Sequence, residues 1–332
     1  MKNYRKLLAG SLALLFAVGI TGCSNTSGGG TGVANEDGLV VLNVASTGQP
    51  VSFDPADANL VVNEYTEYDC YDTLLDFNQD GTDVVPALAE SWEQVDDLTY
   101  TYKIREGVKF SDGSDLTMDD VLYSLNRVRE DAYGMSYLFE HVDSFEVDEK
   151  TRTLTVHLTQ PDSTWKYVPA TTPCQILKKS VVEAEGDAYG TNEGSVVGTG
   201  PYKFVSWAAD SQIVLEKNEY WWGGADNLAI DKINFFVMKD ASTIALAVKS
   251  GTIDFAPGIT NDVLPTYESL SNYNIIHDFE TSTVFVALNT QVAPFDDVNA
   301  RKALAYCIDS SLVQQSIGGE YSAKLDLPLI HI

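Results

Sequence analysis

Residues 99–120, TYTYKIREGVKFSDGSDLTMDD, contain the signals for a strand, a turn and the start of a helix. Over 99–104 aromatic and aliphatic residues alternate with polar ones, which is the two-residue period of a half-buried β-strand. The run SDGSD at 111–115 predicts a turn; its oxygen atoms could also suit calcium, but the EF-hand spacing with a distant glutamate is missing. Thr117 and Asp120 form a Thr-x-x-Asp capping box, so a helix should begin here.

Further strands are expected on both sides of this stretch. Residues 39–45 are apolar and β-branched, which is typical of a buried strand. Apolar and polar residues alternate over 153–159, which should place His157 on the outward face of a strand rather than in a metal site. A turn at 148–150 would join this strand to 144–147 as a hairpin.

Helices and strands are mixed along the chain. Besides the helix after Thr117, we expect one over Ala241–Lys249 and one from Asp296 and Asp297 through Ile308. Strands outnumber helices and both alternate with irregular loops, so the fold class is α/β or mixed α+β. A length of 332 residues predicts about two domains, because single cores stop growing near ~250–300 residues.

The N-terminus has the pattern of an export signal. Three cations precede an apolar run at 7–20, which is shorter than the ~20 residues that span a bilayer comfortably. The residues ITGC at 20–23 resemble the lipobox of bacterial lipoproteins, which are cut before a diacylglyceryl cysteine. We therefore expect a signal peptide at 1–22, lipidation of Cys23 and a flexible Gly/Ser-rich tether at 23–38; a plain signal peptide with a chance cysteine is the alternative.

Charge and cysteine content limit the classes of partner. Removal of the three signal-peptide cations takes the formal charge from −27 to −30, which disfavours nucleic acid as a partner. Because the acidic residues are spread along the chain, they predict a solvated surface. Cys70, Cys174 and Cys307 are too far apart in the sequence to form a CxxC motif. Two of them could form one disulfide, but the sequence does not decide which two.

Common catalytic and cofactor motifs are missing. The sequence has no G-x-S-x-G, H-E-x-x-H or P-loop signature and no histidine spaced for zinc, so we expect no enzyme, no cofactor and no metal site. The residues GTGP at 198–201 imitate a phosphate loop, but Pro201 lacks an N–H, and a rigid turn before a strand at 202–205 fits better. The aromatic residues at 220–222 predict either packing or a ligand platform.

Several phrases, in their order, resemble family 5 bacterial solute-binding proteins, the oligopeptide, dipeptide and nickel binders of ABC importers. The resemblance covers the chain from about Leu39 to its end, and Met118 departs from it by standing where alanine is usual. The phrases are SFDP at 52–55, VPALAESW at 85–92, the stretch 100–120, GTGPYKF at 198–204, LEKNEYWW at 215–222, KSGTID at 249–254, LN at 288–289, PFDD at 294–297, RKAL at 301–304 and ID at 308–309.

The resemblance implies a two-lobed periplasmic-binding-protein type II fold with an inserted domain. On this pattern the first lobe comprises 39–60 and 198–282, and the inserted domain comprises 61–197. Residues 283–332 would begin the second lobe through a crossing strand at 283–289. Family members continue well beyond the position that corresponds to Ile332, so the second lobe is expected to be incomplete. An incomplete lobe would expose apolar surface and bind peptide weakly.

The resemblance also implies a function. The protein would be exported and anchored by lipid at the outer face of the cytoplasmic membrane, as a monomer that captures peptides by hinge closure and delivers them to ABC permease subunits. A nickel or metal-chelate binder, another small-solute binder and a surface receptor for signalling peptides are alternatives; a secreted hydrolase is disfavoured. The implied ligand contacts are Asn59, Leu60, Val61, Tyr137 and Phe285.

Overall fold

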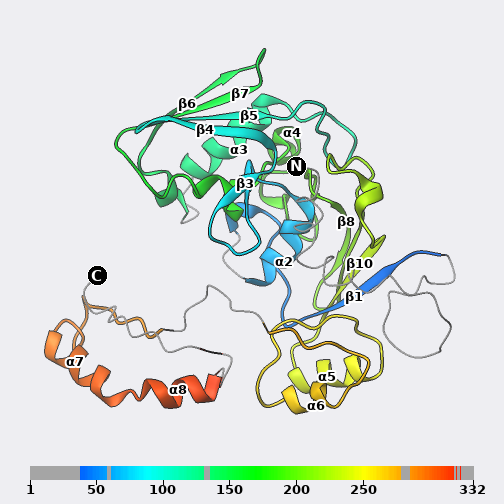
Figure 1. Ribbon diagram of the computed structural model, residues 1–332, viewed down its shortest axis with the longest axis vertical. Coiled ribbons are helices and arrows are strands. Elements are labelled where there is room, and N and C mark those ends of the chain that lie inside the picture. The colour runs from blue at the N-terminus through cyan, green and yellow to red at the C-terminus, as the bar shows by residue number, and fades with distance from the viewer. Residues whose placement is uncertain are drawn as a thin grey trace.

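The computed structural model describes residues 38–57, 61–130, 135–277, 285–317, 319 and 322. The described elements form two four-stranded sheets with helices packed beside them (Figure 1). Among these residues, no helix is both long enough and apolar enough to cross a membrane. The expected class, α/β or mixed α+β, is confirmed.

The first sheet has the strand order β1-β10-β9-β8. Its strands are β1 (Val41–Ser46), β8 (Tyr202–Ala208), β9 (Gln212–Lys217) and β10 (Lys232–Val237). β1 pairs in parallel with β10, so that Val44 lies opposite Phe235, and the other pairs are antiparallel. Inward side chains such as Leu42, Leu215 and Ile233 form one core with residues of the preceding loops. The strand predicted at 39–45 is therefore present and begins two residues later.

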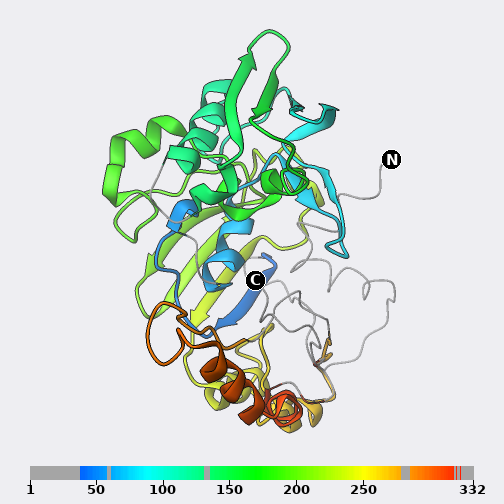
Figure 2. The same cartoon turned by 90° about the vertical axis from the view of Figure 1, so that its left-hand side faces the viewer.

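The second sheet is antiparallel and follows the order β4-β5-β7-β6. Its strands are β4 (Ala89–Asp96), β5 (Thr99–Ile104), β6 (Val142–Asp148) and β7 (Thr153–Leu158). The β6–β7 hairpin confirms the pairing predicted from the turn at 148–150, and it projects at the top of Figure 2. His157 is partly exposed, as its place in the alternation predicts, with Glu146 of the neighbouring strand 3.8 Å away.

Helix α3 (Met118–Glu130) packs on the second sheet. Its apolar residues Val121, Leu125 and Val128 are buried against the inward residues of β5 and β7. This helical spacing of three and four residues places them on one face, as the sequence pattern predicts.

The remaining elements are short. They are the hairpin strands β2 (Leu75–Phe77) and β3 (Val84–Pro86); the helices α2 (Val61–Cys70), α4 (Lys179–Glu185), α5 (Ala241–Lys249), α6 (Leu264–Glu268), α7 (Val298–Cys307) and α8 (Ser310–Ile317); and the 3₁₀ turns η1 (Pro55–Asp57), η2 (Ser136–Phe139), η3 (Val168–Ala170), η4 (Thr172–Cys174), η5 (Gly186–Ala188) and η6 (Ala225–Asn227). Helices α5 and α6 share a third core with Ala45 of β1.

Helices α7 and α8 lie apart from α5 and α6 in Figure 1. No residue of α7 is buried, and apolar side chains of this region are exposed, among them Tyr306 at 91% and Leu312 at 63%. The apolar exposure expected after residue 283 is therefore found. Two details of the prediction are wrong: α7 ends at Cys307 rather than Ile308, and the described part of the expected crossing strand, 285–289, is not a strand.

Candidate ligand-binding site

The structure describes only some of the residues that the sequence assigns to a ligand site. Asn59, Leu60 and the lipidation residue Cys23 lie outside the described residues, and Val61 is described only by its backbone, as the first residue of α2. Tyr137 and Phe285 are described.

Tyr137 and Phe285 are both exposed. Tyr137 is part of η2, and its side chain is 61% exposed; Phe285 follows the α5–α6 region and is 67% exposed. Among the residues that the structure describes, no strand pairing, hydrogen bond or aromatic contact joins the two. Both are accessible to a ligand, but the structure does not bring them together.

The segment that precedes α2 is tightly held; we call residues 52–57 the Asp54 loop. The Asp54 N–H donates to Ser52 Oγ at 2.9 Å, and the Ala56 N–H donates to Asp54 Oδ1 at 3.1 Å. Phe53 is fully buried, with its ring edge-on to Phe204 of the first sheet. The loop therefore leaves the first sheet in a fixed conformation before α2 begins.

A buried ion pair connects this loop to α3. Arg127, in the last turn of α3, donates from Nη1 to Asp54 Oδ1 at 2.7 Å and from Nη2 to Asp54 Oδ2 at 2.5 Å. The side chains are only 15% and 7% exposed. Parallel donation from a planar guanidinium to both carboxylate oxygens fixes orientation as well as distance.

A glycine and a tyrosine hold the other side of the loop. The Phe53 N–H donates to Gly190 O at 2.7 Å, and a Cβ at Gly190, whose φ is +73°, would lie 2.5 Å from the Asp54 nitrogen. The neighbouring Tyr189 hydroxyl lies 2.8 Å from the Tyr71 hydroxyl. Burial raises the pKa of both phenols, so they stay neutral and share a hydrogen bond.

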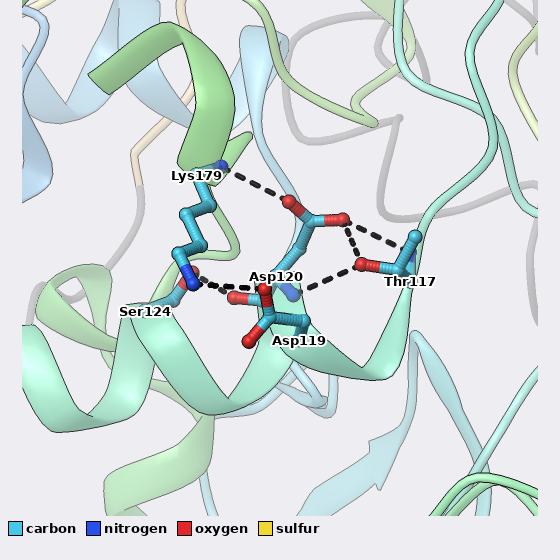
Figure 3. Close-up of polar contacts among 5 residues, drawn as sticks. All are labelled: Thr117, Asp119, Asp120, Ser124 and Lys179. Atoms are coloured by element: carbon cyan, nitrogen blue, oxygen red, sulfur yellow. Dashed lines mark hydrogen bonds and ion pairs between the residues drawn. The ribbon is translucent and has the colours of Figure 1, made fainter. Parts of the chain in front are cut away.

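The N-terminus of α3 is fixed by the predicted capping box, shown in Figure 3. The Thr117 N–H donates to Asp120 Oδ2 at 3.0 Å, and the Asp120 N–H donates to Thr117 Oγ1 at 3.1 Å. The Lys179 N–H at the start of α4 donates to Asp120 Oδ1 at 3.0 Å, while Lys179 Nζ lies 2.9 Å from Asp119 Oδ2. The cap therefore also joins α3 to α4.

Helix α2 ends against the GTGP segment. The Gly200 N–H donates to Cys70 O at 3.0 Å, and Cβ atoms at Gly198 and Gly200 would lie within 2.5 Å of the Cys70 carbonyl group. The glycines thus permit close packing of backbone on backbone, which favours the rigid-turn interpretation over a phosphate cradle.

Asp69 lies in the last turn of α2. The residue is partly exposed, but its Oδ2 atom is sealed from solvent and has no hydrogen-bond partner in the described part of the chain. Burial raises the pKa of this carboxyl to about 7.

The three residues of the aromatic triplet differ in their surroundings: Trp221 is buried and Tyr220 is 40% exposed. Trp222 donates from Nε1 to Asp72 Oδ2 at 2.8 Å, and the Arg105 guanidinium lies 4.9 Å from the centre of its ring, so packing accounts for it. Cys70, Cys174 and Cys307 are free thiols, of which the first two are buried. Among the described residues no group of three or more metal-ligating side chains could hold a metal ion.

Sequence reasoning missed the partners that hold this region. The SFDP phrase marked Asp54, but nothing local pointed to Arg127, which is 73 residues away. Asp69 also gave no signal, because an acidic residue near a helix end is ordinary. A buried aspartate before proline and an arginine on the helix after the capping box could have been paired only by knowledge of the fold.

Comparison with known proteins places the chain in a family. The model of "Bacterial extracellular solute-binding proteins, family 5 Middle" matches residues 83–329. Heme-binding protein A of Haemophilus influenzae is 28% identical over 84% of this chain and 55% of its own length. Oligopeptide-binding protein OppA of Bacillus subtilis is 28% identical over 93% of this chain and 61% of its own length. The chain thus spans about three fifths of the length of these curated relatives.

A solved structure agrees with this result. The periplasmic binding protein DppA of Helicobacter pylori, in complex with the peptide STSA, superposes with a TM-score of 0.72 at 27% identity, over 84% of this chain and 58% of that one. The expected periplasmic-binding-protein type II fold is therefore confirmed for the part that matches. Because the family model covers well over half of the sequence, the chain belongs to the bacterial extracellular solute-binding proteins of family 5.

Proposed function

We propose that the chain belongs to the extracytoplasmic substrate-binding component of an ABC importer, and that this component captures peptides. The observation that carries the proposal is the likeness to DppA, whose structure contains a bound peptide. Oligopeptide-binding protein OppA supports the same class of ligand. An extended peptide would pair through its main chain, so that hydrogen bonds give affinity while open pockets accept different side chains.

The proposed mechanism is closure of two lobes over the ligand. We assign 39–60 and 198–282 to the first lobe, 61–197 to the inserted domain and 283–332 to the start of the second lobe. The separate core around the second sheet supports an inserted domain, while the core of the first sheet also takes in Cys70, Tyr71 and Tyr189 from the ends of 61–197. The ligand must bind the closed state more tightly than the open one, because only that difference shifts the equilibrium. A permease would then recognise the closed form, and no covalent chemistry is needed.

Mass spectrometry of ligands that co-purify with the protein tests the proposal. The protein, produced in its native host, should release short peptides on denaturation. Isothermal titration with a random tetrapeptide pool should then give saturable binding. A protein that carries no peptide and shows no heat with the pool would refute peptide capture.

A metal chelate is the second candidate ligand. Heme-binding protein A, at 28% identity over 84% of the chain, favours this class. Haem gives a visible absorption band that peptides lack, so difference spectroscopy on addition of haem separates the two candidates. A haem spectrum that a peptide excess does not displace would favour the chelate.

We also propose that Cys23 carries the lipid anchor. Two acyl chains bind a bilayer stably, because each buried CH₂ contributes about 0.8 kcal/mol. The Gly/Ser-rich residues that follow would hold the folded part away from the membrane as a monomer. The signal-peptide pattern and the cysteine at its end support this proposal.

A further inference from the structure

We propose that Arg127 is a positioning residue for ligand binding, which holds the Asp54 loop in register with the segment that presents Tyr137. The inference rests on the proposed function, since it names a determinant of that same site. The role that we assign to Arg127 is to position other residues, not to contact the ligand. It acts through Asp54 and through the helix on which it lies.

The ion pair with Arg127 holds the side of the Asp54 loop that faces α3. On one side the loop is bound to the first sheet through the buried ring of Phe53. On the other side both oxygens of Asp54 accept hydrogen bonds from Arg127, and one of them also accepts the Ala56 N–H. The guanidinium thereby fixes the carboxylate at the centre of the described loop, residues 52–57.

The same helix supports the segment of Tyr137. After α3 the chain forms η2, and Phe139 of η2 is buried in the core that contains Val128 of α3. Met135 and Leu138 pack against that core, whereas the Tyr137 side chain points to solvent. Helix α3 therefore carries Tyr137 by apolar packing and the Asp54 loop by an ion pair.

The far end of α3 is immobilised as well. The capping box at Thr117 and Asp120 joins this end to Lys179 of α4 (Figure 3). Ser124 Oγ also accepts the Leu177 N–H at 2.9 Å. Because these contacts hold the first two turns of α3 in place, the last turn, which contains Arg127, is held in place as well. Through Asp54 on one side and the core under η2 on the other, Arg127 then links the Asp54 loop to the segment that presents Tyr137.

Lysine cannot replace arginine in this role. An ammonium group keeps the charge, but it is a point donor and cannot bond both carboxylate oxygens in one plane. Arg127→Lys should thus leave the protein folded while the Asp54 loop loses its fixed orientation. A matched control is Arg129→Lys, two residues further along the same helix, where Arg129 donates to the carbonyl of the exposed Asp143 at 2.6 Å and lies over the Phe145 ring without an ion pair in the described part of the chain.

Two measurements on the full chain test the proposal. Hydrogen exchange without ligand should show faster exchange of the Phe53 and Ala56 amides in Arg127→Lys, and unchanged exchange in β5 and in the first turns of α3. Titration with the random tetrapeptide pool should show an affinity about tenfold lower for Arg127→Lys than for Arg129→Lys, the loss expected for one charge-assisted bond.

A second variant guards against loss of the fold. If Arg127→Lys does not fold, the double change Asp54→Asn with Arg127→Gln removes both charges together and leaves no unpaired buried charge. It should fold and still show faster exchange at Phe53 and Ala56.

Equal exchange at these amides in the Arg127 and Arg129 variants would overturn the proposal, and so would equal affinities. A wild-type protein that binds no peptide would refute the proposed function alone, because the exchange measurement needs no ligand.

Discussion

Asp69→Asn should stabilise the protein at neutral and alkaline pH. The carboxyl is sealed from solvent at Oδ2, and burial raises its pKa from the ordinary 3.8 to about 7. In the unfolded chain the Asp69 carboxyl ionises near its ordinary pKa, so folding above that pH requires either protonation of the carboxylate or burial of a charge. The asparagine side chain has a similar shape and carries no charge.

The magnitude follows from the shift in pKa. A rise in pKa from 3.8 to about 7 sets an upper limit of about 4 kcal/mol, because a tenfold change in the ionisation equilibrium is worth 1.36 kcal/mol and a partly exposed carboxylate keeps some of its hydration. For an acid whose folded pKa is raised, stability is fully present below the unfolded pKa and is lost as pH rises through the folded pKa. The penalty should therefore grow between about pH 4 and pH 7 and stay constant above that range.

Urea unfolding in buffers of about pH 4.5 and about pH 8 compares the unfolding free energies of the wild type and of Asp69→Asn directly. We expect a small advantage of the variant at the lower pH, where the penalty has only begun to grow, and a clearly larger advantage at the higher pH. Asp226→Asn, on the exposed turn η6, is the control and should change neither. A variant that is less stable at pH 8, or whose advantage is the same at both pH values, would refute the reasoning.

Three further predictions concern the cap and two proposed residues. Asp120→Ala removes the acceptor at the start of α3 and should lower the unfolding free energy by about 1–2 kcal/mol in urea titration, whereas an unchanged midpoint would show that the cap is dispensable. Tyr137→Ala should weaken peptide binding in calorimetry with little change in melting temperature, because the side chain is exposed; unchanged affinity would exclude it from the site. Cys23→Ala should move the protein from the membrane fraction to the soluble fraction with its fold unchanged, and retention after a carbonate wash would contradict the anchor.

Local signals predicted the local elements well. The alternation at 99–104 and the capping box at Thr117 correspond to β5 and to the start of α3, because both depend on contacts within a few residues. The strand expected at 283–289 was a family-based expectation, and its described part is irregular. A strand needs a neighbouring strand to satisfy its backbone groups, and composition cannot reveal whether a neighbour is present.

Long-range polar contacts were beyond the sequence. The pair formed by Asp54 and Arg127 joins two segments 73 residues apart, and neither residue type is unusual in its own surroundings. The family resemblance located the loop after Asp54 as a ligand segment but did not identify what fixes it. That role of Arg127 became visible only through the burial and geometry of the pair.

The parallel pairing of β1 with β10 has a consequence for how the protein acquires its fold. Val41 of β1 lies opposite Lys232 of β10. During synthesis or export, about 190 further residues must therefore emerge after β1 before its partner strand is available. The second sheet, by contrast, is complete within residues 89–158 and is built from antiparallel neighbours. Because closing a long loop costs more entropy than closing short ones, the second sheet should form early and the first sheet late. Until residue 237 has emerged, the apolar edge of β1 stays unpaired, and this interval is when the chain is most exposed to misassociation.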